Sequence, residues 1–209
     1  DANCYASLQS NREWPILNAD IHQTSSRQLL DTGQLRVGDI NLLIGGPPCQ
    51  PFSKAGYWVT GDTLRLDDER AETLYAYMRC VADLLPEVFV LENVHGINYS
   101  GKEEGLRLLV QMTEHINRRY GTNYRMSWRV VNAADYGVPQ LRQRFFLVAH
   151  RDGRKFRFPD PTHGDVTALL KRLKPYVTAW DAIGNLVVDP SEDLRVRGRW
   201  GDLLPSIPE

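Results

Sequence analysis

The sequence predicts an α/β fold built on a mostly parallel sheet with an antiparallel edge strand, and three observations lead to this prediction. A short apolar run, Leu42–Ile44, stops at the glycines and prolines of 45–48. A second apolar run, Val88–Leu91, has the same character. Runs of this kind are typical of strands buried on both faces. Between them lies a helical pattern of apolar residues, as expected where a helix joins two parallel strands.

The first half of the chain is predicted to contain three helices. A short helix follows the end of a strand in residues 1–11, and a short helix and turn occupy 28–39. Acidic residues at 67–69 open a third helix, where they favour the helix dipole, and Pro86 ends it. Its apolar stripe is predicted to be core packing and consists of Leu74, Tyr77, Met78, Val81, Leu84 and Leu85.

The second half is predicted to begin with a crossover helix over 103–120. The strands 124–132 and 144–149 then pair antiparallel at one edge of the sheet. Turn residues at 158–164 mark an exit from the core, and two short helices follow at 165–173 and 179–186. We therefore expect one core in 1–160 and an exit segment in 161–209.

Composition limits the class of protein. With 209 residues, 42% of them hydrophobic, the chain can bury the core of one domain and the start of a second. No apolar run approaches a membrane span and no signal segment is evident, so a cytoplasmic protein without a membrane partner is expected. Three cysteines without a CxxC pair suggest a reducing compartment and argue against a structural metal.

The net charge of −1 does not by itself indicate a nucleic-acid-binding protein. Basic residues nevertheless recur through 142–157 and again at 171–174. A local basic face that holds phosphates and a merely solvated charged surface are both consistent with this distribution.

Cys49 is the residue most suggestive of chemistry. It follows the strand that ends at the two glycines, and prolines on both sides restrict its backbone. The carboxyl edge of an open α/β sheet is where ligands bind. A buried structural cysteine is the alternative. Glu92 lies at the corresponding end of the next apolar run, where partial burial favours a proton donor, although a helix-capping role is also open.

Three motifs in order resemble the cytosine-C5 DNA methyltransferase family of bacterial modification methylases. They are Pro47–Ser53, Leu91–Val94, and Asp135–Gln140 with Arg142 and Arg144. The resemblance runs from the first residue to about 164 and more loosely to the end. It implies a Rossmann-like S-adenosylmethionine-dependent methyltransferase core.

The resemblance also implies the catalytic residues. Cys49 attacks C6 of a cytosine that has been flipped out of the duplex, Glu92 hydrogen-bonds or protonates N3, and Arg144 steadies O2. Arg142 and Asn93 belong to the same implied set. Methyl transfer to C5 and loss of the C5 proton then release Cys49.

The cofactor implied is S-adenosyl-L-methionine, with S-adenosyl-L-homocysteine as product. Asp1 falls where the family binds the ribose hydroxyls, Asp20 where it accepts from the adenine amine, and Ile21 where it supplies an apolar wall. Pro48 and Leu74 are the remaining implied contacts. For Asp20, capping of the turn before 23–26 is the alternative.

The implied partner is double-stranded DNA, with Gln50, Ser53 and Gln140 as substrate-binding residues. A bacterial, nucleoid-associated enzyme is expected, which leaves room for a restriction endonuclease counterpart. Recognition sequence and oligomeric state stay open.

We expect the chain to be an interior piece of such an enzyme, inactive or weakly active alone. The family's opening glycine-rich cofactor loop, its target-recognition region and its returning C-terminal helix do not appear in the sequence. The resemblance therefore implies that 1–160 is a partial catalytic core and that the exit segment in 161–209 is also partial. The alternatives are the family's tRNA-directed branch, disfavoured by Gln140, and a non-catalytic nucleic-acid-binding module of the same fold. A cysteine hydrolase is a weaker idea because no histidine falls in a matching motif.

Overall fold

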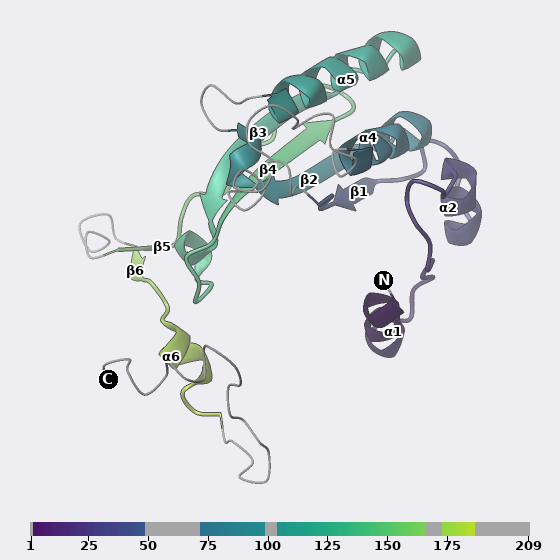
Figure 1. Cartoon of the computed structure of the whole chain (residues 1–209). Coiled ribbons are helices and arrows are strands. Elements are labelled where there is room, and N and C mark those ends of the chain that lie inside the picture. Colours follow the sequence, from purple (N-terminus) through teal and green to yellow (C-terminus); the bar gives the residue numbers. More distant parts are fainter. Residues whose placement is uncertain (1, 49–71, 99–103, 166–172, 187–209) are drawn as a thin grey trace.

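The computed structural model describes residues 2–48, 72–98, 104–165 and 173–186. Its main sheet contains β1 (Leu42–Gly45), β2 (Val88–Val94), β3 (Arg125–Asn132) and β4 (Gln143–His150), in the order β1-β2-β4-β3 (Figure 1). β1 and β2 pair parallel, whereas β4 is antiparallel to both β2 and β3. β1, β2 and β3 therefore point in one direction and β4 in the other, which confirms the predicted fold class.

The antiparallel strand β4 lies one place in from the edge. The short 3₁₀ helix η4 (Ala133–Tyr136) and a turn connect β3 to β4, and the full length of each strand pairs with the other. β4 also pairs with all of β2, so β3 is left at the edge of the sheet. The predicted antiparallel pairing of these two strands at one edge is thus confirmed. The antiparallel strand is not itself the edge strand, contrary to the prediction, because β4 pairs with β2 as well as with β3.

Two helices cover one face of the sheet. α4 (Glu72–Leu84) and α5 (Glu104–Tyr120) lie side by side on it, as Figure 1 shows. Side chains alternate between the faces of a strand, and those of Phe89, Phe145 and Leu147 on this face are fully buried. They form one core with the apolar stripe of α4, so the prediction that the stripe is core packing is confirmed.

The opposite face of the sheet is more open than the sequence predicts. Val88 and Val90 are only half-buried there, and Leu42 and Ile44 of β1 are 50% and 68% exposed. The expectation of strands buried on both faces is therefore wrong for the described part of the chain. The reason is that α4 and α5 pack on the same side and β1 forms an edge.

The N-terminal helices α1 (Ala2–Asn11) and α2 (Ser26–Gly33) confirm the helices predicted there. α2 starts two residues earlier than expected because Ser25 and Gln28 form a capping box. α1 has no buried residues and lies apart from the sheet in Figure 1.

The C-terminal part adds a two-stranded parallel sheet, β5 (His163–Gly164) with β6 (Lys174–Pro175), and the helix α6 (Ala179–Ile183). Thr178 caps α6, which begins at the predicted residue 179 but ends at Ile183, earlier than expected. Most of the helix predicted at 165–173 lies outside the described residues. None of the helices in the described ranges is long and apolar enough to cross a membrane.

Candidate active site at the carboxyl end of strand β2

Glu92 and Arg144 form an ion pair on the open face of the sheet. Strand alternation places Glu92 on the same side as Val90, and Arg144 of β4 lies opposite Val94. Arg144 Nε is 2.9 Å from Glu92 Oε1, and the two side chains are 24% and 36% exposed. A charge-assisted contact this short fixes both groups in a partly solvated position.

β2 is longer than predicted, since it continues through Val94. Glu92 and Asn93 therefore lie within the strand and not beyond it. The pairing with β4 causes the extension, because it runs as far as Val94 opposite Arg144.

Asn93 points to the buried face and holds the loop that follows β1. Its side chain is 3% exposed, its Nδ2 donates to the carbonyl oxygen of Pro47 over 3.5 Å, and its Oδ1 accepts from Val94 N at 2.7 Å. Pro47 is buried and Pro48 is exposed. The end of β2 and the loop that leads to Cys49 are thus in direct contact.

Gly45, the last residue of β1, and Gly46, the first residue of this loop, bring the backbone close to other groups. A Cβ atom at Gly45 would lie 2.4 Å from Tyr77 Cε2, and one at Gly46 would lie 3.4 Å from Glu92 Oε2. The ring of Tyr77 is fixed, because its hydroxyl donates to the carbonyl oxygen of Val90 at 2.9 Å. The chain therefore leaves β1 over the Tyr77 ring and passes Glu92.

Four of the predicted site residues lie outside the described residues: Asp1, Cys49, Gln50 and Ser53. The roles expected for them stay predictions. Cys49 is the next residue in the chain after Pro48.

Arg142 and Gln140 lie in the turn between β3 and β4, and both are exposed. Their backbone groups build this turn. Arg142 N donates to Asn132 Oδ1 at 2.9 Å, and Gln140 N donates to the Val138 carbonyl oxygen at 2.7 Å. Arg144 is thus the arginine of this motif that contacts Glu92.

Asp20 and Ile21 lie on a turn that precedes α2. Asp20 Oδ1 accepts from His22 N at 2.9 Å, so Asp20 has the turn-capping role considered as the alternative. Its carboxylate is nevertheless exposed, and the neighbouring Ile21 side chain is half-buried. An exposed acceptor beside an apolar group suits an adenine ring with its amine. Leu74, in contrast, packs within the core at 3% exposure.

Sequence reasoning missed two side chains that support these loops, Tyr77 and Arg79. Tyr77 was assigned to core packing, and its contact with Gly45 leaves no signal in the sequence. Arg79 donates to backbone oxygens of the 21–26 segment. It is the only charged residue between Thr73 and Ala82. A lone charge in such an apolar stretch of a helix could have indicated a side chain with partners inside the protein, but the prediction considered only the apolar residues.

Cys80 has the buried structural role that was considered for Cys49. It is 3% exposed within α4, and burial raises the pKa of its thiol. A thiol that stays protonated and inaccessible is a poor nucleophile. In the described part of the chain, no group of histidine, cysteine and acidic side chains is arranged to hold a metal ion.

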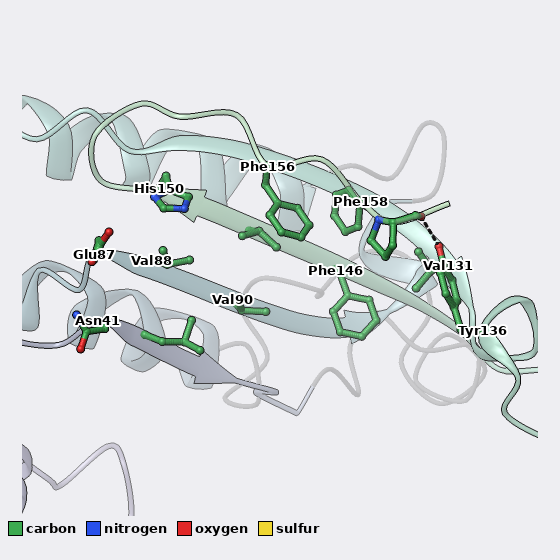
Figure 2. A pocket seen from close by; sticks show the side chains of 13 residues that line it. Asn41, Glu87, Val88, Val90, Val131, Tyr136, Phe146, His150, Phe156 and Phe158 are labelled. Atoms are coloured by element: carbon green, nitrogen blue, oxygen red, sulfur yellow. Dashed lines mark hydrogen bonds between the residues drawn. The ribbon is translucent and has the colours of Figure 1, made fainter. Parts of the chain in front are cut away.

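A cavity of about 680 Å³ lies along the open face of the sheet (Figure 2). Its wall is mainly apolar: Val90 and Phe146 lie in its middle, and Phe156 and Phe158 pack over it from the segment after β4. Glu92 is on the same face, one alternation beyond Val90. The cavity therefore borders the candidate active site and does not contain its ion pair.

Comparison with known proteins identifies the family. The sequence profile described as C-5 cytosine-specific DNA methylase matches residues 1–195, so the chain belongs to this family. Type II methyltransferase M.AquIA of Picosynechococcus is 36% identical over 197 residues, which cover 89% of this chain and 77% of that protein. M.SacI of Streptomyces achromogenes is also 36% identical, over 92% of this chain and 48% of the relative. The chain thus spans only part of the length of these relatives.

Solved structures agree on the fold. An E. coli prophage protein assigned as a DNA modification methyltransferase superimposes with a TM-score of 0.57 at 23% identity, covering 83% of this chain and 42% of the other. The Dnmt2 methyltransferase of S. pombe gives a TM-score of 0.51 at 15% identity over 93% of this chain and 49% of the other.

Proposed function

We propose that this chain is the part of a DNA methyltransferase that transfers a methyl group from S-adenosylmethionine to C5 of cytosine. The observation that carries the proposal is the Glu92–Arg144 pair beside the loop that leads to Cys49. The position of Asn93 supports it, because its contact with Pro47 joins this loop to the strand that carries the acid.

The chemistry requires a nucleophile because C5 of cytosine does not attack a methyl group readily. The Cys49 thiolate forms a bond to C6, and the electron pair of the C5–C6 double bond becomes available at C5. When bound, S-adenosylmethionine supplies an electrophilic methyl group. After C5 is methylated, its proton leaves to a base or to solvent, the double bond forms again, and the S–C6 bond breaks to release Cys49.

Glu92 and Arg144 are proposed to act on the ring during this addition. Negative charge moves toward N3 and O2 as the thiolate adds, so an acid at N3 and a guanidinium at O2 stabilise the adduct. The partial exposure of both side chains supports access by a base. An entering cytosine competes for groups that contact each other in the free chain.

The cofactor is proposed to lie against Asp20 and Ile21, with Pro48 and the first residue, Asp1, as further contacts. Asp20 accepts from the adenine amine and Ile21 covers one side of the ring. Leu74 is proposed to act only from within the core, as its burial indicates.

The proposed substrate is duplex DNA, from which the target cytosine must leave the base stack before it reaches the sheet edge. Gln50, Ser53 and Gln140 are proposed substrate contacts. The type II methyltransferases among its relatives favour a restriction-modification context. A restriction endonuclease counterpart is part of this proposal.

Methyl transfer by the full-length protein tests the proposal. Tritium from the labelled cofactor is expected in duplex DNA and not in tRNA. Glu92→Gln is expected to lower the rate about 100-fold or more, since general acid catalysis contributes on this order. Glu87→Gln is the matched control, because Glu87 precedes β2 and its carboxylate also contacts an arginine, Arg154, at 3.3 Å. Label in tRNA alone would assign the tRNA-directed branch, and label in neither polymer would leave a non-catalytic module.

A further inference from the structure

Arg79 of α4 binds the turn that carries Asp20 and Ile21. Its Nη2 atom donates to two backbone carbonyl oxygens, that of Ile21 at 2.8 Å and that of Thr24 at 3.0 Å. Its Nη1 atom donates to Ser26 Oγ at 3.4 Å. One half-buried guanidinium therefore spans the segment from 21 to 26.

Two further contacts tie the same segment to α4. Ser26 Oγ donates to Asp83 Oδ2 at 2.6 Å, and His22 Nε2 lies 3.2 Å from Thr73 Oγ1. The anchoring side chains on α4 thus extend from its first turn to its last, with Arg79 between them.

The turn has little else to fix its position. Thr24 and Ser26 are the buried side chains of this segment, and both are polar, so its attachment depends on hydrogen bonds. Arg79 is suited to this because its rigid planar fork reaches several oxygens and does not lose its charge.

α4 also supports the loop after β1, since Tyr77 packs against Gly45. Tyr77 and Arg79 are two residues apart, which puts them on opposite sides of a helix. α4 thus lies between the sheet and the 21–26 segment, in agreement with its position beside α2 in Figure 1. The same helix sets the position of both loops.

We propose that Arg79 is a positioning residue that holds the Asp20–Ile21 turn on α4 in the conformation that binds the cofactor. This inference rests on the proposed function, because it takes that turn as part of the cofactor site. Arg79 contacts the protein backbone and not the reacting atoms, so its effect is expected on cofactor affinity and not on the methyl-transfer step.

The test compares Arg79→Met and Arg79→Lys with Arg27→Met in the full-length protein. Arg27 is a matched control because it lies on α2 with an 88% exposed side chain, which pairs with Asp31 of the same helix at 3.6 Å. S-adenosylhomocysteine is the calorimetric probe. Arg79→Met is expected to raise its Kd and the KM for S-adenosylmethionine about tenfold, because hydrogen bonds from a charged group are lost. The kcat at saturating cofactor is expected to stay within about threefold.

Arg79→Lys is expected to fall between the wild type and Arg79→Met, because an ammonium reaches fewer of the three oxygens. If Arg79→Met does not fold, Arg79→Lys carries the test, and its Kd is expected to rise about threefold.

The outcomes separate the two proposals. Wild-type protein that binds no S-adenosylhomocysteine contradicts the proposed function itself. Wild-type binding with an unchanged Kd in the folded Arg79 variants overturns only the role of Arg79. A fall in kcat with an unchanged KM also overturns it.

Discussion

The contact between Gly45 and Tyr77 predicts that the last residue of β1 cannot carry a side chain. A Cβ atom at Gly45 would lie 2.4 and 2.5 Å from two carbons of the Tyr77 ring. Carbon atoms in ordinary contact are about 3.5 Å apart, so the overlap is about 1 Å. The ring cannot move easily, because its hydroxyl is bonded to the Val90 carbonyl and its edge packs on Phe89.

Gly45→Ala is therefore expected to lower the free energy of unfolding by about 2 kcal/mol, within the usual range for an overpacked core. Urea denaturation followed by circular dichroism measures this as a fall of about 1 M in the midpoint. Gly46→Ala is the matched control. Its Cβ would lie 3.4 Å from Glu92 Oε2, which is ordinary contact, so a change below about 0.5 kcal/mol is expected.

A double-mutant cycle with Tyr77→Leu isolates the clash. Removing the ring should make room for the new methyl group, so Gly45→Ala should cost about 2 kcal/mol less in that background. The same displacement moves the strand end that leads to Cys49, and a 1 Å shift at a reacting group costs about 100-fold in rate. An unchanged midpoint for Gly45→Ala, or an equal cost in both backgrounds, would refute the reasoning.

Three further predictions concern other parts of the fold. Gly137→Ala should lower the free energy of unfolding by about 2 kcal/mol in thermal or urea unfolding. Gly137 has a φ of +88°, and a Cβ atom there would lie 2.8 Å from the His163 ring, so an unchanged stability would show that this contact does not form. Asn93→Leu should lower the free energy of unfolding in urea by about 2 kcal/mol. It removes the hydrogen bond to the Pro47 carbonyl oxygen and leaves the backbone amide of Val94 without its side-chain acceptor, so an unchanged stability would contradict the role of Asn93. Burial raises the pKa of Tyr124 in the folded state above about 10, the value for an exposed tyrosine. The protonated hydroxyl of Tyr124 therefore makes its full contribution to stability below about pH 10, and this contribution is lost as the pH rises above that value. Tyr124→Phe should make the fall in unfolding free energy above pH 10 less steep by up to about 1.4 kcal/mol per pH unit, and an equal slope would contradict this assignment.

The positions of strands and helices could be predicted because apolar patterning dominates them. The limits of β2 could not, since its extension through Glu92 and Asn93 depends on pairing with β4 and not on hydropathy. The open face was also missed. An apolar run such as Val88–Leu91 shows that side chains can be buried, but it does not show which face is covered.

The motif order placed Glu92 and Arg144 together, and their 2.9 Å contact confirms this proximity. The sequence did not indicate that Glu92 and Arg144 pair with each other, because each was predicted to contact the cytosine ring. Ion pairing with acidic residues also reduces the positive charge of the predicted basic face. Arg154 contacts Glu87, and Arg144 contacts Glu92, so acids that the linear sequence separates neutralise part of it. Such pairs arise from the fold and leave no periodic signal.

Covalent trapping tests the central chemical step most directly. In duplex DNA that carries 5-fluorocytosine at the target, C5 has no proton to lose after methylation, so the S–C6 bond cannot break. With cofactor present, the full-length protein is expected to form a complex that survives denaturation in detergent. Cys49→Ser should abolish this complex, whereas Cys80→Ser should retain it, because Cys80 is buried in α4. A detergent-stable complex that forms equally well with Cys49→Ser would contradict the assignment of Cys49 as the nucleophile.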